Sequence, residues 1–230
     1  MPVLIRPARP ADAPALLDVK RHLRLPADPG QAPRGGFLLG TTLAQYAYFI
    51  EHDDVLVAAD DAAGRVAGFS IVLGHASVLS SDLWQRAQRA RWDATFLGTL
   101  GGDIAGRPFA FYEQLGCLPD DASRVFAKYL AFASVHRALA VYPSLITTIL
   151  RVPVYNRAAL PFLEVAGFTA VGWIAEHYPE VGRIESEIYH LDAVEFRRRL
   201  ERPDFRAFLA RARRQGYLDQ ALLEHEAWPT

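Results

Sequence analysis

A strand that stops at a proline and gives way to a helix can bind an anion, and residues 112–130 carry that pattern. The stretch is "YEQLGCLPDDASRVFAKYL", with an apolar strand before Pro119 and helical spacing after it. The first N–H groups of a helix have no partner within the helix, and the helix dipole makes that end positive. Ser123, Arg124 and Lys128 add a hydroxyl and two cations, so this end could hold a phosphate or pyrophosphate. The alternative is an ordinary capped helix with solvated basic side chains.

A second junction between a strand and a helix lies in "PVYNRAALPFLEVAGF", residues 153–168, which follows the β-branched run "SLITTILRV". Asn156 comes just after the predicted strand, where its amide could bond a ligand, cap the helix, or do both. Pro161 falls within the helical spacing, so we expect a kink or a later start of the helix.

Three residues of the strand before Pro119 have alternative roles. Glu113, taken by itself, is interpreted as a solvated or salt-bridged carboxylate of the strand. Cys117, the only cysteine of the chain, has no histidine close in sequence, which favours a packing role over a covalent nucleophile. Gly116 indicates either a β-bulge or a close approach of the backbone to another group.

The elements expected around these residues alternate strands and helices in the second half of the chain. Residues 54–73 form the clearest hairpin, with two apolar runs joined by "DDAAGR". Residues 26–36 are rich in Pro and Gly and predict a loop, whereas residues 78–98 have the spacing of one amphipathic helix. The arginine-rich tail from Asp192 is also helical in pattern. This order predicts an α/β protein with a mixed sheet of about seven strands and helices on both faces.

Composition narrows the classes of function. The chain has 230 residues, 51% of them hydrophobic, which is enough for one domain with a full core. Its net charge of −1 gives no global attraction to nucleic acid or to a membrane. Seven scattered histidines and one cysteine predict neither a disulfide framework nor a dedicated metal site. Without a signal-peptide pattern or a long apolar run, we expect a cytoplasmic protein.

The order of elements and the two junctions resemble the GNAT superfamily of acyl-CoA-dependent N-acyltransferases. The second junction matches the family pattern Asn-x-x-Ala-x(7)-Gly-Phe through Asn156, Ala159, Gly167 and Phe168. The first junction looks like the family's fourth strand, pyrophosphate loop and following helix. The resemblance covers about residues 3–191, and it implies a sheet that splays open between strands 4 and 5.

The resemblance also implies roles for individual residues, with acetyl-CoA as the cosubstrate and no metal. Glu113 would act as general base, and the backbone N–H of Cys117 would polarise the thioester carbonyl, as an oxyanion donor does. The pantetheine arm would pair with the free edge of strand 4 as an added strand would. The residues implied to bind acetyl-CoA are Leu115, Cys117, Ser123, Arg124, Val125, Phe126, Ala127, Lys128 and Asn156.

Two parts of the family pattern are not matched. The pyrophosphate loop of the family is (Gln/Arg)-x-x-Gly-x-(Gly/Ala), but Val125 replaces its central glycine and only the small Ala127 is kept. The tyrosine that protonates the departing thiolate in many members is replaced by Leu163. Tyr155 and Tyr129 are the nearby hydroxyls that could replace it, and water is the alternative.

The sequence therefore predicts an N-acetyltransferase that acts on a primary amine of a small molecule or peptide. The alternative is a catalytically degenerate member of the same fold that binds acyl-CoA as a sensor or interaction module. We expect a GNAT-like domain over residues 1–191, with a helical insertion at 78–107, and a C-terminal helical extension at 192–230. The insertion could form the surface of a homodimer, be a solvated face, or shape the acceptor pocket. We expect no nucleic-acid or membrane partner.

Overall fold

The computed structural model describes residues 3–24, 36–37, 40–100, 102–178, 182–218 and 222. Within them one mixed sheet has eight strands in the order β1-β2-β3-β5-β6-β8-β7-β4. The strands are β1 (Leu4–Pro7), β2 (Asp54–Asp60), β3 (Arg65–Leu73), β4 (Arg91–Trp92), β5 (Ala110–Cys117), β6 (Ser144–Val152), β7 (Thr169–Tyr178) and β8 (Gly182–Asp192). The mixed α/β class is confirmed, with one strand more than the predicted seven.

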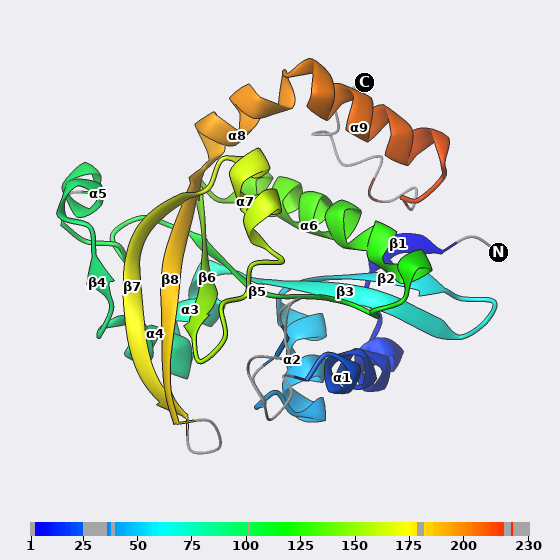
Figure 1. Cartoon of the computed structure of the whole chain (residues 1–230), viewed down its shortest axis with the longest axis horizontal. Coiled ribbons are helices and arrows are strands. Elements are labelled where there is room, and N and C mark those ends of the chain that lie inside the picture. Colours follow the sequence, from blue (N-terminus) through cyan, green and yellow to red (C-terminus); the bar gives the residue numbers. More distant parts are fainter. Residues whose placement is uncertain are drawn as a thin grey trace.

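Helices cover both faces of the sheet, as Figure 1 shows. Those described are the 3-10 turn η1 (Pro10–Asp12), α1 (Ala13–His22), α2 (Leu43–His52), α3 (His75–Leu79), α4 (Asp82–Ala87), α5 (Ala94–Thr99), α6 (Asp121–Val141), α7 (Leu160–Ala166), α8 (Ala193–Leu200) and α9 (Pro203–Arg214). In Figure 1 helices α6 to α9 lie above the sheet, and α1 and α2 lie below it. No helix in the described ranges combines the length and apolarity needed to cross a membrane.

Two hydrophobic cores, one on each face, fix the central strands. On the upper face the ring of Phe132 in α6 packs 5.7 Å from that of Phe196 in α8 and 5.5 Å from that of Phe205 in α9. On the lower face Leu16 of α1 and Tyr46 of α2 are fully buried against β3. Because the sheet is covered on both faces, β5 and β6 cannot shift without disturbing two cores at once.

The segment predicted as one helix over 78–98 is broken, so that prediction was wrong. It contains the end of α3, then α4, the edge strand β4 and α5. The carboxylate of Asp93 accepts the N–H of Phe96 at 2.8 Å and so starts a new helix at that point. Strand β4 lies close to β7 because Gly172 has no side chain: a Cβ there would stand 2.5 Å from the carbonyl oxygen of Arg91. Tertiary pairing has overridden the helical spacing.

Other sequence predictions have simpler outcomes. The hairpin over 54–73 is confirmed as β2 and β3. Helix α7 begins at Leu160 with Pro161 in its first turn, which is the later start that the proline predicted. The tail forms α8 and α9, whereas the Pro/Gly-rich loop lies almost wholly outside the described residues.

The close contact between β3 and β5 gives a first prediction. A Cβ at Gly68 would meet the Sγ of Cys117 and would stand 2.8 Å from the carbonyl oxygen of Gly116. The carbonyl of Gly116 is part of the backbone and cannot move aside as a flexible side chain could. Gly68→Ala should therefore lower the free energy of unfolding by about 1–3 kcal/mol, measured by urea denaturation. The matched control is Gly98→Ala, because Gly98 lies in α5 with nothing within 4 Å of an added Cβ. Equal stability of the two variants would contradict this reading of the contact.

Candidate functional site

Strands β5 and β6 run parallel but stay paired over only three residues. The pairs are Ala110 with Leu145, Phe111 with Ile146 and Tyr112 with Thr147. Beyond them β5 remains paired with β3, and β6 remains paired with β8. The two strands therefore diverge, and a cavity of about 1290 Å³ lies along the gap.

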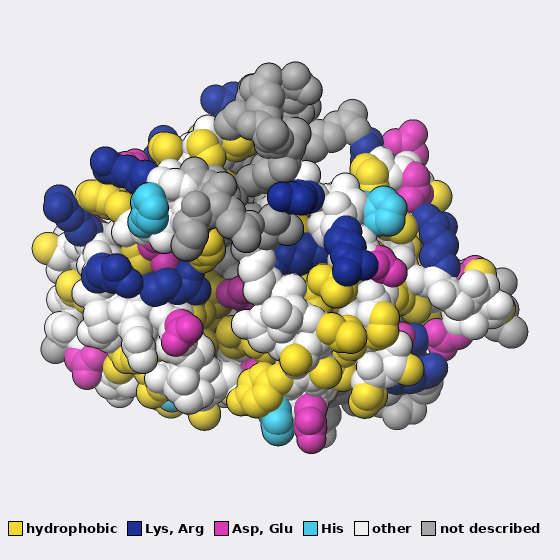
Figure 2. Space-filling view, turned by 90° about the horizontal axis from the view of Figure 1, so that it is seen from below, with side chains coloured by type: hydrophobic (Ala, Val, Ile, Leu, Met, Phe, Trp, Pro, Cys, Tyr) yellow, Lys and Arg dark blue, Asp and Glu magenta, His cyan; other side chains and the backbone are white. Residues whose placement is uncertain are grey.

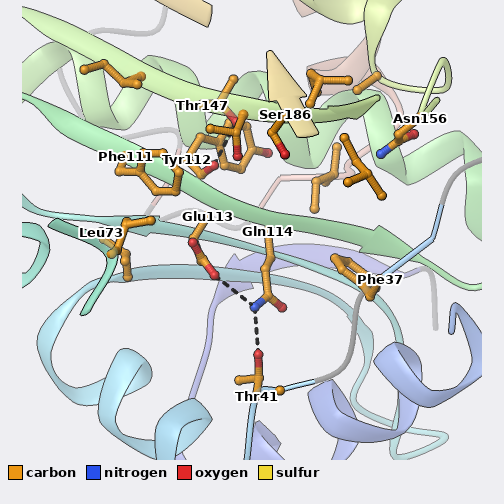
Figure 3. Close-up of a pocket in the computed structure, with 18 of the residues that line it drawn as sticks. Phe37, Thr41, Leu73, Phe111, Tyr112, Glu113, Gln114, Thr147, Asn156 and Ser186 are labelled. Atoms are coloured by element: carbon orange, nitrogen blue, oxygen red, sulfur yellow. Dashed lines mark hydrogen bonds between the residues drawn. The ribbon is translucent and has the colours of Figure 1, made fainter. Parts of the chain in front are cut away.

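A hydroxyl and a bulge mark the point of divergence. The Thr147 hydroxyl donates to the carbonyl of Tyr112 at 2.9 Å, so this carbonyl is not left unpaired where the ladder stops. Next to it, Ile71 of β3 pairs with Gln114 and Val72 pairs with Tyr112, which leaves Glu113 as the extra residue of a β-bulge. As a result Glu113 and Gln114 point to the same side of β5, as Figure 3 shows.

The divergence leaves one edge of β5 free. The N–H of Leu118 bonds the carbonyl of Ala67 at 2.8 Å and so points toward β3. Backbone groups of successive strand residues point to opposite edges, so those of Cys117 and Leu115 face the gap. Both residues line the cavity.

Gly116 allows other side chains to approach the backbone of β5 closely, which is one of the two roles that its presence suggested. The bulge, the other suggested role, lies at Glu113 instead. A Cβ on Gly116 would stand 2.8 Å from the Phe37 ring and 3.0 Å from a methyl carbon of Leu23. The glycine therefore allows α1 and Phe37 to pack directly against β5 below the gap.

Glu113 is a half-buried carboxylate on the cavity wall. Burial raises its pKa, and a hydrogen bond from Gln114 and the charges of Arg86 and Lys20 offset part of that rise. The amide of Gln114 is oriented by its other partners: its oxygen accepts from the Tyr46 hydroxyl at 3.0 Å. The amide nitrogen of Gln114 therefore faces Glu113 and donates to one of its carboxylate oxygens at 3.5 Å.

Below Glu113 lies a lysine that the sequence analysis missed. Lys20 is 6% exposed and donates to the hydroxyl oxygen of Thr41 at 2.5 Å, and Thr41 also accepts from Gln114 at 3.0 Å. Burial lowers the pKa of the Lys20 ammonium to about 8. A signal was present in the sequence, because Lys20 follows Leu16 by four residues and so shares the apolar face of α1.

Arg86, on the insertion helix α4, forms the other charged contact of this wall. Its Nη1 donates to a Glu176 carboxylate oxygen at 3.1 Å and to the Tyr178 hydroxyl at 2.5 Å. Both partners lie on β7, ninety or more positions away in the chain, so no local pattern could predict the contact. The buried Nε of Arg86 has no hydrogen-bond partner.

Asn156 lies on the opposite side of the β5 ribbon from Glu113 in Figure 3. It lines the cavity, and its side-chain oxygen is buried without a hydrogen-bond partner. Its backbone N–H bonds the carbonyl of Leu150 at 2.9 Å, which holds the turn after β6. Because α7 begins only at Leu160, Asn156 does not cap it. Because Asn156 lines the same cavity as the open strand edge, its side-chain amide is placed to hydrogen-bond a ligand there.

Comparisons with known proteins support one fold. No family model matches the chain, and no curated protein matches it. Among solved structures, it is similar to Naa20 of Chaetomium thermophilum in complex with a bisubstrate analogue (14% identity, 88% of this chain and 93% of that chain, TM-score 0.55). It is also similar to an N-acetyltransferase of Staphylococcus aureus Mu50 (16% identity, 84% of this chain and 99% of that chain, TM-score 0.52). A third similar structure is yncA of Salmonella typhimurium with acetyl-CoA (16% identity, 84% of this chain and 95% of that chain, TM-score 0.53). The chain has the GNAT fold.

The helix tip of this GNAT fold differs from the loop that the sequence suggested. Helix α6 begins at Asp121, and the N–H of Arg124 already bonds the carbonyl of Asp120 at 3.1 Å. The buried Ser123 gives both its N–H and its hydroxyl to the Asp120 carboxylate, each at 2.8 Å. The residues implied to form a pyrophosphate loop are therefore part of a regular helix.

Those residues do not all reach the cavity. Arg124 and Ala127 line it, and Arg124 is paired with Asp121 at 3.2 Å. Ser123, Val125, Phe126 and Lys128 are not among its lining residues. Phe126 packs in the core against the ring of Tyr217, and the Lys128 ammonium lies over the rings of Tyr129 and Phe208.

The hydroxyls considered as proton donors lie away from the cavity. The Tyr155 ring is flanked by the guanidinium groups of Arg151 at 5.0 Å and Arg157 at 5.4 Å, and Tyr129 stacks on Phe208. Neither tyrosine lines the cavity, whereas the buried Leu163 does.

Two further groups bear on the chemistry of the site. Burial raises the pKa of the Cys117 thiol to about 12, so this thiol is protonated at neutral pH and is a poor nucleophile. In the part of the chain that the structure describes, no group of three or more His, Cys, Asp or Glu side chains is placed to hold a metal.

Charges on the surface below the sheet are mixed. Figure 2 shows this face with acidic and basic side chains interspersed among hydrophobic ones. Such a mixed face gives only a weak long-range attraction to a strongly charged partner.

The buried Lys20 gives a prediction about stability and pH. Below about pH 8 its ammonium is charged in both the folded and unfolded chain and its burial costs free energy; above its ordinary pKa of 10.5 it is neutral in both. Stability should therefore rise with pH between these values. Lys20→Met should stabilise the fold by up to about 3 kcal/mol at pH 7 and by less than about 1 kcal/mol at pH 10.

Urea denaturation at the two pH values measures this difference. Arg21→Met is the matched control, because Arg21 is the next residue of α1, is exposed, and as an arginine stays charged over this range. A stabilisation by Lys20→Met that is the same at both pH values would contradict the assigned cost of burying the charge.

Proposed function

We propose that this chain is an N-acyltransferase that transfers an acetyl group from acetyl-CoA to a primary amine of a small molecule or peptide. The observation that carries the proposal is the free edge of β5, which lines the same cavity as the side-chain amide of Asn156. The neighbours of the same fold support it, since one is described with acetyl-CoA and another with a bisubstrate analogue.

The donor arm fits the gap by the chemistry of strand pairing. A pantetheine arm is extended and carries two amides, so it can add to the edge formed by the backbones of Leu115 and Cys117. The side-chain amide of Asn156 would hydrogen-bond the same arm from the opposite wall. The N–H of Cys117 would also donate to the thioester carbonyl oxygen as negative charge develops there.

Glu113 would serve as the general base on the acceptor side. Its carboxylate takes the proton of the acceptor ammonium, directly or through a water, and the neutral amine then attacks the thioester carbon. The C–N bond forms, the C–S bond breaks, and the thiolate takes a proton from water, since Leu163 stands at the family's acid position. Burial makes Glu113 a stronger base than an exposed carboxylate.

The acceptor side of the cavity has apolar walls and a charged end. Trp84, Phe109 and Phe111 line it, together with Arg86 and Glu176. This lining suits an amine attached to an apolar or aromatic body, which the rings would cover while the ammonium meets the carboxylates.

A second candidate is an acyl-CoA-binding module without turnover. The replacement of the acid tyrosine by Leu163 favours it, because that position then supplies no proton to the leaving thiolate. The two candidates share the donor site and differ only in whether acyl transfer occurs, so measuring free thiol over a library of amines separates them.

Glu113→Gln tests the base directly. It should lower kcat by at least about 100-fold and leave the affinity for desulfo-CoA unchanged, because the amide cannot take a proton. In the wild type kcat/KM should rise with pH through a pKa above that of an ordinary carboxylate, and the variant should lose this limb.

Glu51→Gln is the matched control, because this glutamate on α2 is 75% exposed. Equal losses of turnover, donor affinity and stability in Glu113→Gln would make Glu113 a structural residue and remove it from the mechanism.

Asn156→Ala tests the donor contact. Removing one buried hydrogen bond to the arm should weaken desulfo-CoA binding about tenfold in calorimetry. Stability should stay within about 0.5 kcal/mol of wild type, because the Asn156 oxygen has no partner within the fold to lose. Unchanged affinity together with a clear loss of stability would show a structural role instead.

A further inference from the structure

We propose that the donor is selected through its thioester and pantetheine arm, and that the pyrophosphate and nucleotide of CoA add little to its binding. This inference rests on the proposed function and concerns the same donor site. It names the donor class as acyl-pantetheine thioesters, of which acetyl-CoA is one member.

The first observation is that the tip of α6 already holds an anion of its own. The Asp120 carboxylate accepts the N–H and the hydroxyl of Ser123, as described above, and Nη2 of Arg65 donates to it at 3.0 Å. The same Arg65 nitrogen also donates to the Ser123 hydroxyl at 3.1 Å. These contacts lower the pKa of Asp120, so it is ionised at neutral pH. The carboxylate thus uses the hydrogen-bond donors that a phosphate would need.

The second observation concerns the backbone. A pyrophosphate is usually held by several N–H groups that converge from a loop. Here α6 is already helical at Asp121, so the N–H groups from Arg124 onward bond carbonyls within the helix. The N–H of Ser123 bonds the Asp120 carboxylate. Of the N–H groups in the first turn, those of Asp121 and Ala122 then remain for a ligand.

The third observation is the charge balance at the tip. Asp121 adds a second carboxylate in the first turn, fully exposed and paired with Arg124. Arg65 is paired with Asp120 in the same way. Two carboxylates therefore face any approaching pyrophosphate, and the two arginines that would attract it are already engaged.

The pantetheine end shows none of these obstacles. The backbone edge at Leu115 and Cys117 is free, and Asn156 has a buried oxygen without a partner. Binding free energy should therefore come from the arm and the acyl thioester, where unpaired donors and acceptors remain.

Three donors that lose the nucleotide and then the phosphate test this directly. Acetyl-CoA, acetyl-4′-phosphopantetheine and acetyl-pantetheine should bind with dissociation constants within about threefold of one another in calorimetry without an acceptor amine. A preference of about 30-fold or more for acetyl-CoA would overturn this inference and leave the proposed function standing. No heat with any of the three at millimolar concentration would overturn both.

Asp120→Asn isolates the carboxylate, because Asn caps a helix as well as Asp does but carries no charge. The variant should bind acetyl-CoA about fivefold more tightly and acetyl-pantetheine unchanged, since only the former brings a pyrophosphate to the tip. Asp204→Asn is the control: Asp204 lies in the first turn of α9 and pairs with Arg202. Weaker or unchanged binding of acetyl-CoA by Asp120→Asn would overturn the role given to the carboxylate.

Discussion

The divergence of β5 from β6 after Tyr112 is the constraint on which the site depends. Parallel neighbours in a sheet normally stay paired, because an unpaired backbone group costs free energy when it is buried. Here each strand is held by its other neighbour, β3 or β8, and the Thr147 hydroxyl satisfies the carbonyl at the fork. The cores on both faces hold the two strands apart, so the gap is a fixed feature of the fold.

The bulge at Glu113 links this gap to the charges around it. By adding one residue to β5 it turns two consecutive polar side chains toward α1 and α2. Glu113 then shares a poorly solvated wall with Lys20 and Arg86, and each of these charges changes the electrostatic cost of the others. Such a set is expensive to bury, and a site that moves protons is a physical reason to keep it.

Local patterns in the sequence were enough to predict much of this arrangement. Alternation and turn residues predicted the hairpin and the mixed sheet. The β-branched run predicted a strand with Asn156 shortly after it, and the structure has Asn156 in the turn after β6. The place of Glu113 on β5 was also readable, whereas Gly116 was left with two interpretations, a bulge or a close approach. A glycine is compatible with either a bulge or a close contact, and only the position of Phe37 and Leu23 decides between them.

What the sequence did not reveal depends on contacts between distant segments. Arg86 reaches Glu176 across ninety positions, and the supposed insertion helix is broken by pairing with β7. The cap that Asp120 forms on α6 agrees with the capped helix that the sequence offered as the alternative for this junction. The ion pair of Asp120 with Arg65 of the hairpin is the part that no pattern near residue 120 contains.

Amide hydrogen exchange at the free edge of β5 tests the central claim most directly. In the unliganded protein the N–H groups of Leu115 and Cys117 should exchange much faster than that of Leu118, which bonds Ala67. Adding a saturating acyl-pantetheine analogue should slow exchange at both free amides and leave Leu118 unchanged. Slow exchange at Leu115 and Cys117 without ligand, or no change on adding it, would show that this edge is not open to a donor arm.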